Sequence, residues 1–481
     1  MTENQPSVLL INPPITSDQR RGPLGPVIKS LYFNSPPLGL AYIAAVLERD
    51  GIRVGLIDAA VEDLSVEQTV DRIREFAPDL VGLTSTTNFF CNAEELAHLI
   101  RARCPGVKIL IGGPHVASTC ETVLEDPAFD FACLGEGEYT TLELVHALNA
   151  GGDLGEIPGL AFRVDGRLVR TATRPLIENL DDLPLPARHL LPLALYVPQP
   201  NDGPYLPKAA MISSRGCPFR CTFCDHGIYG NTYRSLSSTR IVDEMQELVH
   251  RYGIRDIAFV DSLFMISAKR VNSITEEIVR RGVKIHWTCT IRANIATREI
   301  LERMKAAGCW RVRVGIESGN EEVLRFIKKD VTREQVVRVT RDADDLGLHP
   351  KGFFMIGHPT ETAARIRESM DFARSLPLTD ITVQINTPLP GSPQWHTCRE
   401  QGAILTDDLK KYSFWEPVFV PHGLTQGEIE SLHRKFYRSF YLRPIVWWRH
   451  LRMLKGTDDI RRYLRGISLL ISMFIKKRKR G

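Results

Sequence analysis

The chain has 481 residues, of which 43% are hydrophobic, 25% charged and 8% aromatic. This composition excludes a disordered or collagen-like protein, and the length predicts two or three domains. The formal net charge is only +4, so a general nucleic-acid-binding surface is not expected. The N-terminus lacks the apolar segment of a signal peptide, and the ten cysteines therefore indicate reduced thiols or metal ligands in a cytoplasmic protein.

Residues 1–150 alternate short apolar runs with helical patterns. Strands are predicted at 8–11, 53–57, 80–83, 108–111 and 130–134, and helices at 38–48, 66–76, 93–102 and 139–148. Strands without polar alternation, separated by helices, indicate a parallel sheet that is covered on both faces. We therefore expect an α/β, Rossmann-like (flavodoxin-like) domain, which binds its ligand at the carboxyl ends of the strands.

Small and hydroxyl residues gather in the loops that follow these strands, and they allow a large ligand to approach the backbone closely. The residues in question are Thr84, Ser85, Thr86, Gly112, Gly113 and Gly135. No Gly-x-Gly-x-x-Gly follows the first strand, so dinucleotide binding is poorly supported. The insertion at 15–37 is expected to lie over the ligand face.

Residues 151–204 are predicted to form a β-hairpin at 160–164 and 168–171 and then a proline-rich linker. A second alternating series occupies residues 205–395. Its predicted strands are 209–213, 256–260, 284–290, 311–316, 351–356 and 381–385, with helices such as 239–251, 298–307 and 361–376. This pattern predicts a partial (β/α)6 TIM-like barrel with its active site at the carboxyl ends of the strands. Residues 396–481 are expected to form a small helical C-terminal region.

Three cysteines follow the first strand of the second series at the spacing C-x3-C-x2-C: Cys217, Cys221 and Cys224. Thiolates are soft ligands that suit iron–sulfur clusters, and three of them can hold three irons of a cubane. The fourth iron is then open to a substrate or cofactor. A closed zinc site would need four ligands, and no fourth cysteine or histidine completes a zinc-finger spacing. The other seven cysteines are expected to be mostly buried small hydrophobic residues.

With these cysteines, residues 205–395 resemble the radical S-adenosylmethionine (radical SAM) enzymes. The matching segments include 287–292, 315–319, 354–361 and 388–392. The domain ahead of the barrel makes the chain similar to the cobalamin-binding subgroup, which includes cobalamin-dependent methylases and the anaerobic magnesium-protoporphyrin IX monomethyl ester cyclase. The resemblance implies three cofactors: a 4Fe-4S cluster, S-adenosylmethionine and cobalamin.

The resemblance also implies roles for residues of the barrel. Cys217, Cys221 and Cys224 hold the cluster, and its open iron binds S-adenosylmethionine. The residues expected to contact S-adenosylmethionine are Phe223, Asp261, Arg292, Glu317, Ile356 and Gly357. Alternatives remain for four of them, and Gly357 could merely permit a turn. Arg292 could lie on the surface, and Asp261 could cap the following helix. Glu317 could form an ion pair with Arg313 or Arg292.

For cobalamin, the expected contacts are Thr84, Ser85, Thr86, Gly112, Gly113, His115, Gly135 and Glu136. His115 could instead be a loop histidine with an ordinary hydrogen bond, and Glu136 and Glu138 could cap the following helix. The Asp-x-His-x-x-Gly loop of many cobalamin proteins is absent between residues 12 and 39. The resemblance therefore implies cobalamin without a lower histidine ligand from this loop.

The implied activity is reductive cleavage of S-adenosylmethionine, after which a 5′-deoxyadenosyl radical takes a hydrogen atom from an unactivated position. The substrate is expected to be a small or lipid-like molecule that is methylated on carbon or phosphorus, with electrons from a protein such as flavodoxin or ferredoxin. Two alternatives remain: a radical oxidative cyclase without methyl transfer, and a non-catalytic cobalamin or iron–sulfur sensor.

The C-terminal region has two features of its own. Aromatic residues at 436–448 predict either helix packing or a wall for a large apolar substrate. Residues 446–481 carry eleven Lys/Arg and two Asp, ending in the basic run 476–480. The apolar run 467–475 before it is too short to span a bilayer. Together these runs could form a helix that contacts an anionic membrane surface, or a solvated basic end.

Overall fold

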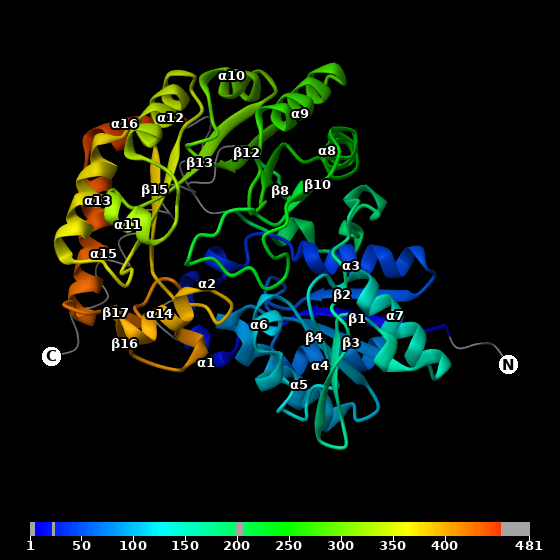
Figure 1. Cartoon of the computed structure of the whole chain (residues 1–481). Coiled ribbons are helices and arrows are strands. Elements are labelled where there is room, and N and C mark those ends of the chain that lie inside the picture. The colour runs from blue at the N-terminus through cyan, green and yellow to red at the C-terminus, as the bar shows by residue number, and fades with distance from the viewer. Residues whose placement is uncertain (1–4, 22–24, 199–204, 454–481) are drawn as a thin grey trace.

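The computed structural model describes residues 5–21, 25–198 and 205–453. Figure 1 shows two α/β units, with the N-terminal one below and the second one above, and the C-terminal elements along one side of both. The cysteine loop, which we define as residues 216–233, runs between the two units.

The N-terminal unit is a seven-stranded sheet in the order β2-β1-β3-β4-β5-β6-β7. Its parallel strands are β1 (Ser7–Asn12), β2 (Arg53–Asp58), β3 (Leu80–Thr84), β4 (Lys108–Gly112) and β5 (Phe131–Cys133). Helices α3 (Leu38–Arg49) and α7 (Gly137–Ala150) cover one face, and α4 (Val66–Phe76), α5 (Phe90–Arg103) and α6 (Pro114–Val123) cover the other. The predicted Rossmann-like fold is confirmed.

The hairpin predicted between the domains extends this sheet. Strands β6 (Leu160–Val164) and β7 (Arg167–Arg170) pair antiparallel, and β6 also pairs antiparallel with β5. Phe162 is buried with the residues of α3 and α7. The hairpin therefore belongs to the first unit by packing, and the chain leaves this sheet only after β7.

The second unit is a parallel six-stranded sheet in the order β15-β14-β13-β12-β11-β8. Its strands are β8 (Lys208–Met211), β11 (Asp256–Phe259), β12 (His286–Ile291), β13 (Cys309–Glu317), β14 (Lys351–Ile356) and β15 (Asp380–Ile385). The helices between them are α8 (Ser238–Tyr252), α9 (Ala268–Arg280), α10 (Arg298–Ala306), α11 (Glu321–Phe326), α12 (Arg333–Asp345) and α13 (Ala363–Ser375). Because β8 and β15 are the two edges and do not pair, the barrel is open on one side, as predicted.

The C-terminal region is mainly helical, as predicted, with one short pair of strands added. It contains α14 (Gln394–Glu400), α15 (Gln426–Tyr441) and α16 (Pro444–Met453), but also an antiparallel pair of strands, β16 (Gly402–Ile404) and β17 (Phe419–Pro421). Phe436 and Phe440 of α15 are buried against the barrel, so these aromatics serve helix packing. The basic run 476–480 lies outside the described residues. Among those described, no helix combines the length and apolarity that a membrane crossing requires.

Helices α1 (Ser17–Arg21) and α2 (Gly25–Tyr32) belong to the insertion at 15–37. The Tyr32 hydroxyl donates a hydrogen bond to the Ser413 carbonyl at 2.5 Å, which joins the insertion to the C-terminal region. Phe33 lines a cavity together with Thr84. The insertion therefore lies over the carboxyl ends of the N-terminal strands, as expected.

Candidate active site

The cysteine loop is closed at its base by a two-stranded ladder. β9 (Ser214–Arg215) pairs antiparallel with β10 (Arg234–Ser235), so both ends of the loop leave from one point. Gly216 has φ +78, and a Cβ there would lie 2.0 Å from the Thr232 carbonyl oxygen. Only glycine fits this turn, which directs the next residue, Cys217, away from the ladder.

The three thiols lie beside two cations. Arg292 Nη1 is 3.8 Å from Cys221 Sγ. A hydrogen bond from Cys224 and the charges of Lys329 and Arg292 lower the pKa of Cys221 to about 6, against the effect of burial. Burial raises the pKa of Cys217. The surroundings of Cys221 thus favour a thiolate, the form that binds iron.

This donor set fits a cubane better than a single ion. Within residues 5–21, 25–198 and 205–453, no three His, Cys, Asp or Glu side chains are close enough to hold one metal ion. In a cubane each thiolate binds a different iron, so the three sulfurs need not converge on one point. The three-cysteine loop, with cations beside it to offset thiolate charge, therefore suits a 4Fe-4S cluster with one open iron.

Arg292 is buried, which excludes the surface alternative. Its guanidinium lies 3.5 Å over the Phe219 ring and also donates to the Lys329 carbonyl. The partner of Glu317 is Lys329, with Nζ 2.7 Å from Oε1, and neither arginine considered from the sequence. Lys329 was not predicted, because it follows α11 in a segment with no motif or periodicity.

Glu317 is held in an unusual backbone conformation. Its φ is +66, in the left-handed region that side chains other than glycine rarely adopt. A Cβ on Gly315 would lie 2.8 Å from Lys329 Nζ and 3.0 Å from Glu317 Oε1, so the Glu317–Lys329 pair packs directly against this glycine. Strain of this kind persists only when the surroundings fix it, and it is enriched at functional sites.

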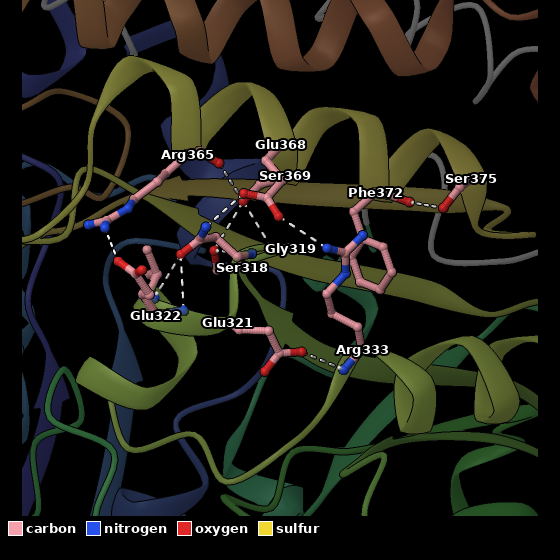
Figure 2. Close-up of polar contacts among 12 residues, drawn as sticks. Ser318, Gly319, Glu321, Glu322, Arg333, Arg365, Glu368, Ser369, Phe372 and Ser375 are labelled. Carbon is pink, nitrogen blue, oxygen red and sulfur yellow. Dashed lines mark hydrogen bonds and ion pairs between the residues drawn. The ribbon is translucent and has the colours of Figure 1, made fainter.

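The surroundings that fix it are drawn in Figure 2. Ser318 Oγ lies 3.0 Å from Ser369 Oγ on α13, and the Gly319 amide donates to the same hydroxyl at 2.9 Å. A Cβ on Gly319 would lie 2.6 Å from Phe372 Cβ, so the chain approaches α13 as closely as it can. These contacts anchor the residues directly after Glu317 and thereby hold its carboxylate beside Lys329.

Asp261 holds the backbone directly before the cysteine loop. Its carboxylate accepts hydrogen bonds from the amides of Ser213, at 2.6 Å, and Ser214, at 3.2 Å. The cap of the next helix, α9, is Ser267, so the capping alternative for Asp261 is wrong. The hydrogen-bond partners of this carboxylate are Ser213 and Ser214, which lie directly before the cysteine loop, and the charge of Arg270 on α9 also acts on it.

The remaining residues expected near S-adenosylmethionine lie at the end of β14 or on the cysteine loop. Ile356 is buried at the end of the strand. Gly357 has φ +86, and its amide donates to Glu361 Oε2 at 2.5 Å. Phe223 lies 5.9 Å from the His358 ring, centre to centre. The two segments are therefore neighbours.

Glu361 should make folding stability depend on pH. Burial raises its pKa from 4.5 to about 8, although the amides of His358 and Gly357 oppose the shift. The folded protein therefore keeps a proton that the unfolded chain releases, and the free energy of unfolding should fall as the pH rises between these values. We expect Glu361→Gln to flatten that fall in urea titrations at several pH values, whereas Glu95→Gln, at an exposed site, should not. An unchanged slope in Glu361→Gln would show that Glu361 is ionised.

A cavity of about 320 Å³, the glycine cavity, lies at the carboxyl ends of the N-terminal strands. Its wall includes Thr84, Gly112, Gly113, Gly135 and Glu136 among the expected cobalamin contacts, together with Gly39, Gly82 and Gly137. A Cβ on Gly39 would meet no atom within 4 Å, and one on Gly135 only the Ile228 carbonyl oxygen at 3.9 Å. Side chains at these two positions would therefore enter the cavity. The glycines form a cradle that suits a large flat ligand such as a corrin.

The other expected contacts lie behind this wall. Gly113 has φ +105, and a Cβ there would be 2.6 Å from the Ser85 carbonyl oxygen, so Ser85 supports the loop. His115 is buried against Phe90, with Nδ1 3.3 Å from Thr87 Oγ1, and burial lowers its pKa to about 4. No histidine is among the described residues that line the glycine cavity.

Glu136 and Glu138 join the two units. Glu136 precedes α7 but makes no capping bond with its side chain. Instead its carboxylate contacts Arg215 at 2.6 Å and Arg234 at 2.8 Å, and Glu138 contacts Arg215 at 2.5 Å. All four side chains are at least nine-tenths buried. The prediction that Glu136 caps α7 is therefore wrong. Glu136 lines the glycine cavity and also belongs to a buried ionic network at the base of the cysteine loop.

Filling the cradle should weaken cobalamin binding without unfolding the chain. Gly39 is the second residue of α3 and exposed, so Gly39→Leu meets no backbone strain. A leucine in the ligand's space should cost about 1–3 kcal/mol, or roughly tenfold or more in cobalamin affinity measured by dialysis. The matched control is Gly427→Leu, at the second residue of α15, which also has open space around it. Equal cobalamin affinity in both variants would place the ligand elsewhere.

Two further cavities continue from the glycine cavity. The middle cavity, of about 470 Å³, is also lined by Pro37, Thr84 and Pro114, and it reaches Asp225 beside Cys224. Thr86 belongs to its wall. The barrel cavity, of about 450 Å³, shares Tyr32, Ser35 and Phe414 with the middle cavity. The glycine cradle, the cysteine loop and the barrel interior thus adjoin one series of cavities.

The glycine cradle on the Rossmann-like sheet and the three-cysteine loop on the open barrel are two candidate cofactor sites, and both border the middle cavity. Comparison with known proteins supports this reading. The description "Radical SAM superfamily" matches residues 211–373, and "B12 binding domain" matches residues 25–145. The chain is 37% identical to uncharacterized methyltransferase PH0819 of Pyrococcus horikoshii over 441 residues, which is 91% of this chain and 93% of that protein.

Two other proteins show the same organisation. The anaerobic magnesium-protoporphyrin IX monomethyl ester cyclase of Cereibacter sphaeroides is 28% identical over 90% of this chain and 70% of its own length. The solved structure of the methyltransferase TsrM from Kitasatospora setae, with cobalamin and a 4Fe-4S cluster bound, superimposes with a TM-score of 0.70 at 19% identity. That match covers 91% of this chain and 89% of TsrM.

The chain belongs to the cobalamin-binding group of radical SAM enzymes. Its cofactors are accordingly a 4Fe-4S cluster, S-adenosylmethionine and cobalamin, as the resemblance implied. The sensor alternative is not supported, because both domains and the complete cysteine loop are those of an enzyme family.

Proposed function

We propose that this enzyme methylates an unactivated carbon or a phosphorus of a small molecule, with S-adenosylmethionine as the methyl source. The observation that carries the proposal is the middle cavity. Its wall contains Thr84 and Pro114 of the glycine cradle and also Asp225, the residue after Cys224. A substrate placed there would be within reach of both cofactor sites. Methyl transfer through cobalamin requires this arrangement.

In this proposal Cys217, Cys221 and Cys224 hold the cluster, which supplies one electron to S-adenosylmethionine when both are bound. Arg292 and the Glu317–Lys329 pair lie next to Cys221 and offer charges of both signs. We assign them to the carboxylate and amino groups of S-adenosylmethionine. Asp261 positions the cysteine loop through Ser213 and Ser214.

For the adenine end we propose the backbone at Ile356 and Gly357, with Phe223 nearby. Thr84, Gly112, Gly113, Gly135 and Glu136 would line the corrin site. Ser85 and His115 would support it from behind, and Thr86 would face the substrate. Tyr32, Phe33, Ser35 and Pro37 of the insertion add to these walls and help exclude water from reactive species.

The products released from S-adenosylmethionine test the proposal. Anaerobic protein refilled with iron, sulfide and cobalamin should yield both 5′-deoxyadenosine and S-adenosylhomocysteine, since methyl transfer consumes one molecule for the radical and one for the methyl group. A cyclase of the magnesium-protoporphyrin type would release 5′-deoxyadenosine without S-adenosylhomocysteine. Release of neither compound by the refilled protein would refute the enzymatic proposal.

A protein electron donor is part of this proposal. Pro218 and Arg220 are exposed on the cysteine loop beside the half-buried Cys217. A negatively charged flavodoxin or ferredoxin could dock there and reduce the cluster in the reducing cytoplasm. Arg220→Glu should slow flavodoxin-dependent turnover while leaving dithionite-dependent turnover unchanged. Equal slowing with both reductants would contradict docking at this point.

Helix α16 is the described element best suited to a membrane surface. Trp447, Trp448 and Leu451 are 43%, 48% and 61% exposed, next to Arg449 and Arg452. Tryptophan and arginine are common where helices meet lipid head groups. We propose that this end of the chain contacts anionic lipid. Co-sedimentation with phosphatidylglycerol vesicles, lost in the Trp447→Ala, Trp448→Ala double variant, is the expected result. Unchanged sedimentation of that variant would contradict it.

A further inference from the structure

The barrel cavity has a positively charged wall. Arg313, Lys208 and Lys351 line it, and no acidic side chain is among its described lining residues. Lys208 and Lys351 have carboxylate neighbours outside the wall, Asp256 at 3.3 Å and Asp380 at 3.4 Å. These two lysines are therefore largely neutralised, and the charge of the cavity rests on the arginine.

Arg313 has no carboxylate partner within the part of the chain that the structure describes. Its Nη2 donates to the Phe259 carbonyl at 3.1 Å and to Thr288 Oγ1 at 3.3 Å, which hold the guanidinium in place. Its Nε is buried and has no hydrogen-bond partner among the described residues. The Nε is too deeply buried for a molecule in the cavity to reach, so a ligand would meet the other edge of the guanidinium. A guanidinium with no carboxylate beside it is best satisfied by an oxyanion.

The rest of the cavity is aromatic and neutral. Phe353, Phe414 and Trp415 lie in its wall with Thr382 and Gln384. Arg313 precedes Glu317 on β13 by four residues, which is about 13 Å along an extended strand. An anion at Arg313 would thus lie deep in the barrel, while the body of its molecule extends along the aromatic wall toward the cofactor sites.

We propose that Arg313 binds an oxyanion group, a carboxylate or a phosphate-type group, at one end of an otherwise largely apolar substrate. This inference rests on the proposed function, because it names the class of molecule that the enzyme would methylate. The two anion types share the same guanidinium chemistry, and the experiment below separates them. Arg313 would act in substrate binding and not in the chemical step.

The test uses the full-length enzyme loaded with its cofactors and two labelled probes, inorganic phosphate and propionate, in equilibrium dialysis. We expect saturable binding of at least one probe, weakened about tenfold or more in Arg313→Gln because a charge-assisted hydrogen bond is lost. Arg313→Lys keeps the charge and should bind with intermediate affinity. Arg341→Gln, which removes an exposed arginine of the outer helix α12, should bind as the wild type does. Binding of phosphate only, or of propionate only, identifies the anion type.

The proposal is overturned if the wild type binds neither probe or if Arg313→Gln binds both as tightly as the wild type. If Arg313→Gln folds poorly, Arg313→Lys decides the question. Loss of all probe binding in a folded Arg313→Lys variant would contradict the role of the charge. The proposed function is judged separately, from the products that the wild type releases from S-adenosylmethionine. If the products contradict the proposed function, the measured binding of phosphate or propionate still stands. If neither probe binds, the products still test the proposed function.

Discussion

Replacing Cys217, Cys221 or Cys224 with alanine is expected to abolish turnover completely and to leave the refilled protein without its cluster. Each thiolate binds a different iron, and no other cysteine lies on the loop to replace a lost one. Iron and sulfide content and the visible absorption of the anaerobic protein measure the cluster, and 5′-deoxyadenosine measures turnover. The far-ultraviolet circular dichroism should stay that of the wild type.

The matched control is Cys104→Ala. Cys104 is also a half-buried free cysteine, but it ends helix α5 in the N-terminal unit. It should keep the full iron content and the full rate. Full iron content and a wild-type rate in any one of the three loop variants would be incompatible with the assignment of that cysteine.

Removing Arg215 should produce the largest loss of stability of any single exchange at the domain boundary. Arg215→Ala leaves the carboxylates of Glu136 and Glu138 buried without their main partner. Breaking a buried ionic network from one side costs about 3–5 kcal/mol. Burial lowers the pKa of Arg215, but Glu138, Tyr229 and Glu136 together outweigh burial and raise the pKa of this arginine, so the charge persists at any working pH.

Urea unfolding followed by tryptophan fluorescence measures this loss. The control is Arg170→Ala, whose partner Glu121 is 54% exposed, and it should cost less than about 1 kcal/mol. Arg215→Ala should also weaken cobalamin binding, because Arg215 and both glutamates line the glycine cavity. Equal stability of the two variants would mean that water or local movement satisfies the carboxylates.

The parts of the fold that were predicted correctly are those that a local pattern specifies. Parallel strands buried on both faces must be apolar, and the runs at 8–11 and 80–83 show this directly. The cysteine loop was found because cluster ligands require a fixed spacing. By contrast, the strands β16 and β17 are three residues each and carry too few positions for a period to be visible.

The residues that were missed act through partners far away in the sequence. Arg215 meets Glu136 across 79 positions, and Lys329 meets Glu317 only because the chain turns back after α11. No periodicity or spacing rule encodes such a pair. For Glu136 the sequence suggested a cobalamin contact or helix capping, and for Glu138 helix capping, because capping is the nearest explanation that a local pattern offers.

The separation of the cavity walls has a consequence for how such enzymes diversify. The cradle and the cysteine loop come from residues near strand ends. The barrel cavity is also lined by two loop segments, Tyr32 with residues 34–36, and residues 413–415. Mutations in those two segments can change the shape of the barrel cavity without changing the cysteine loop. New substrates can therefore be acquired through loop changes alone, while the costly cofactor scaffold is inherited intact.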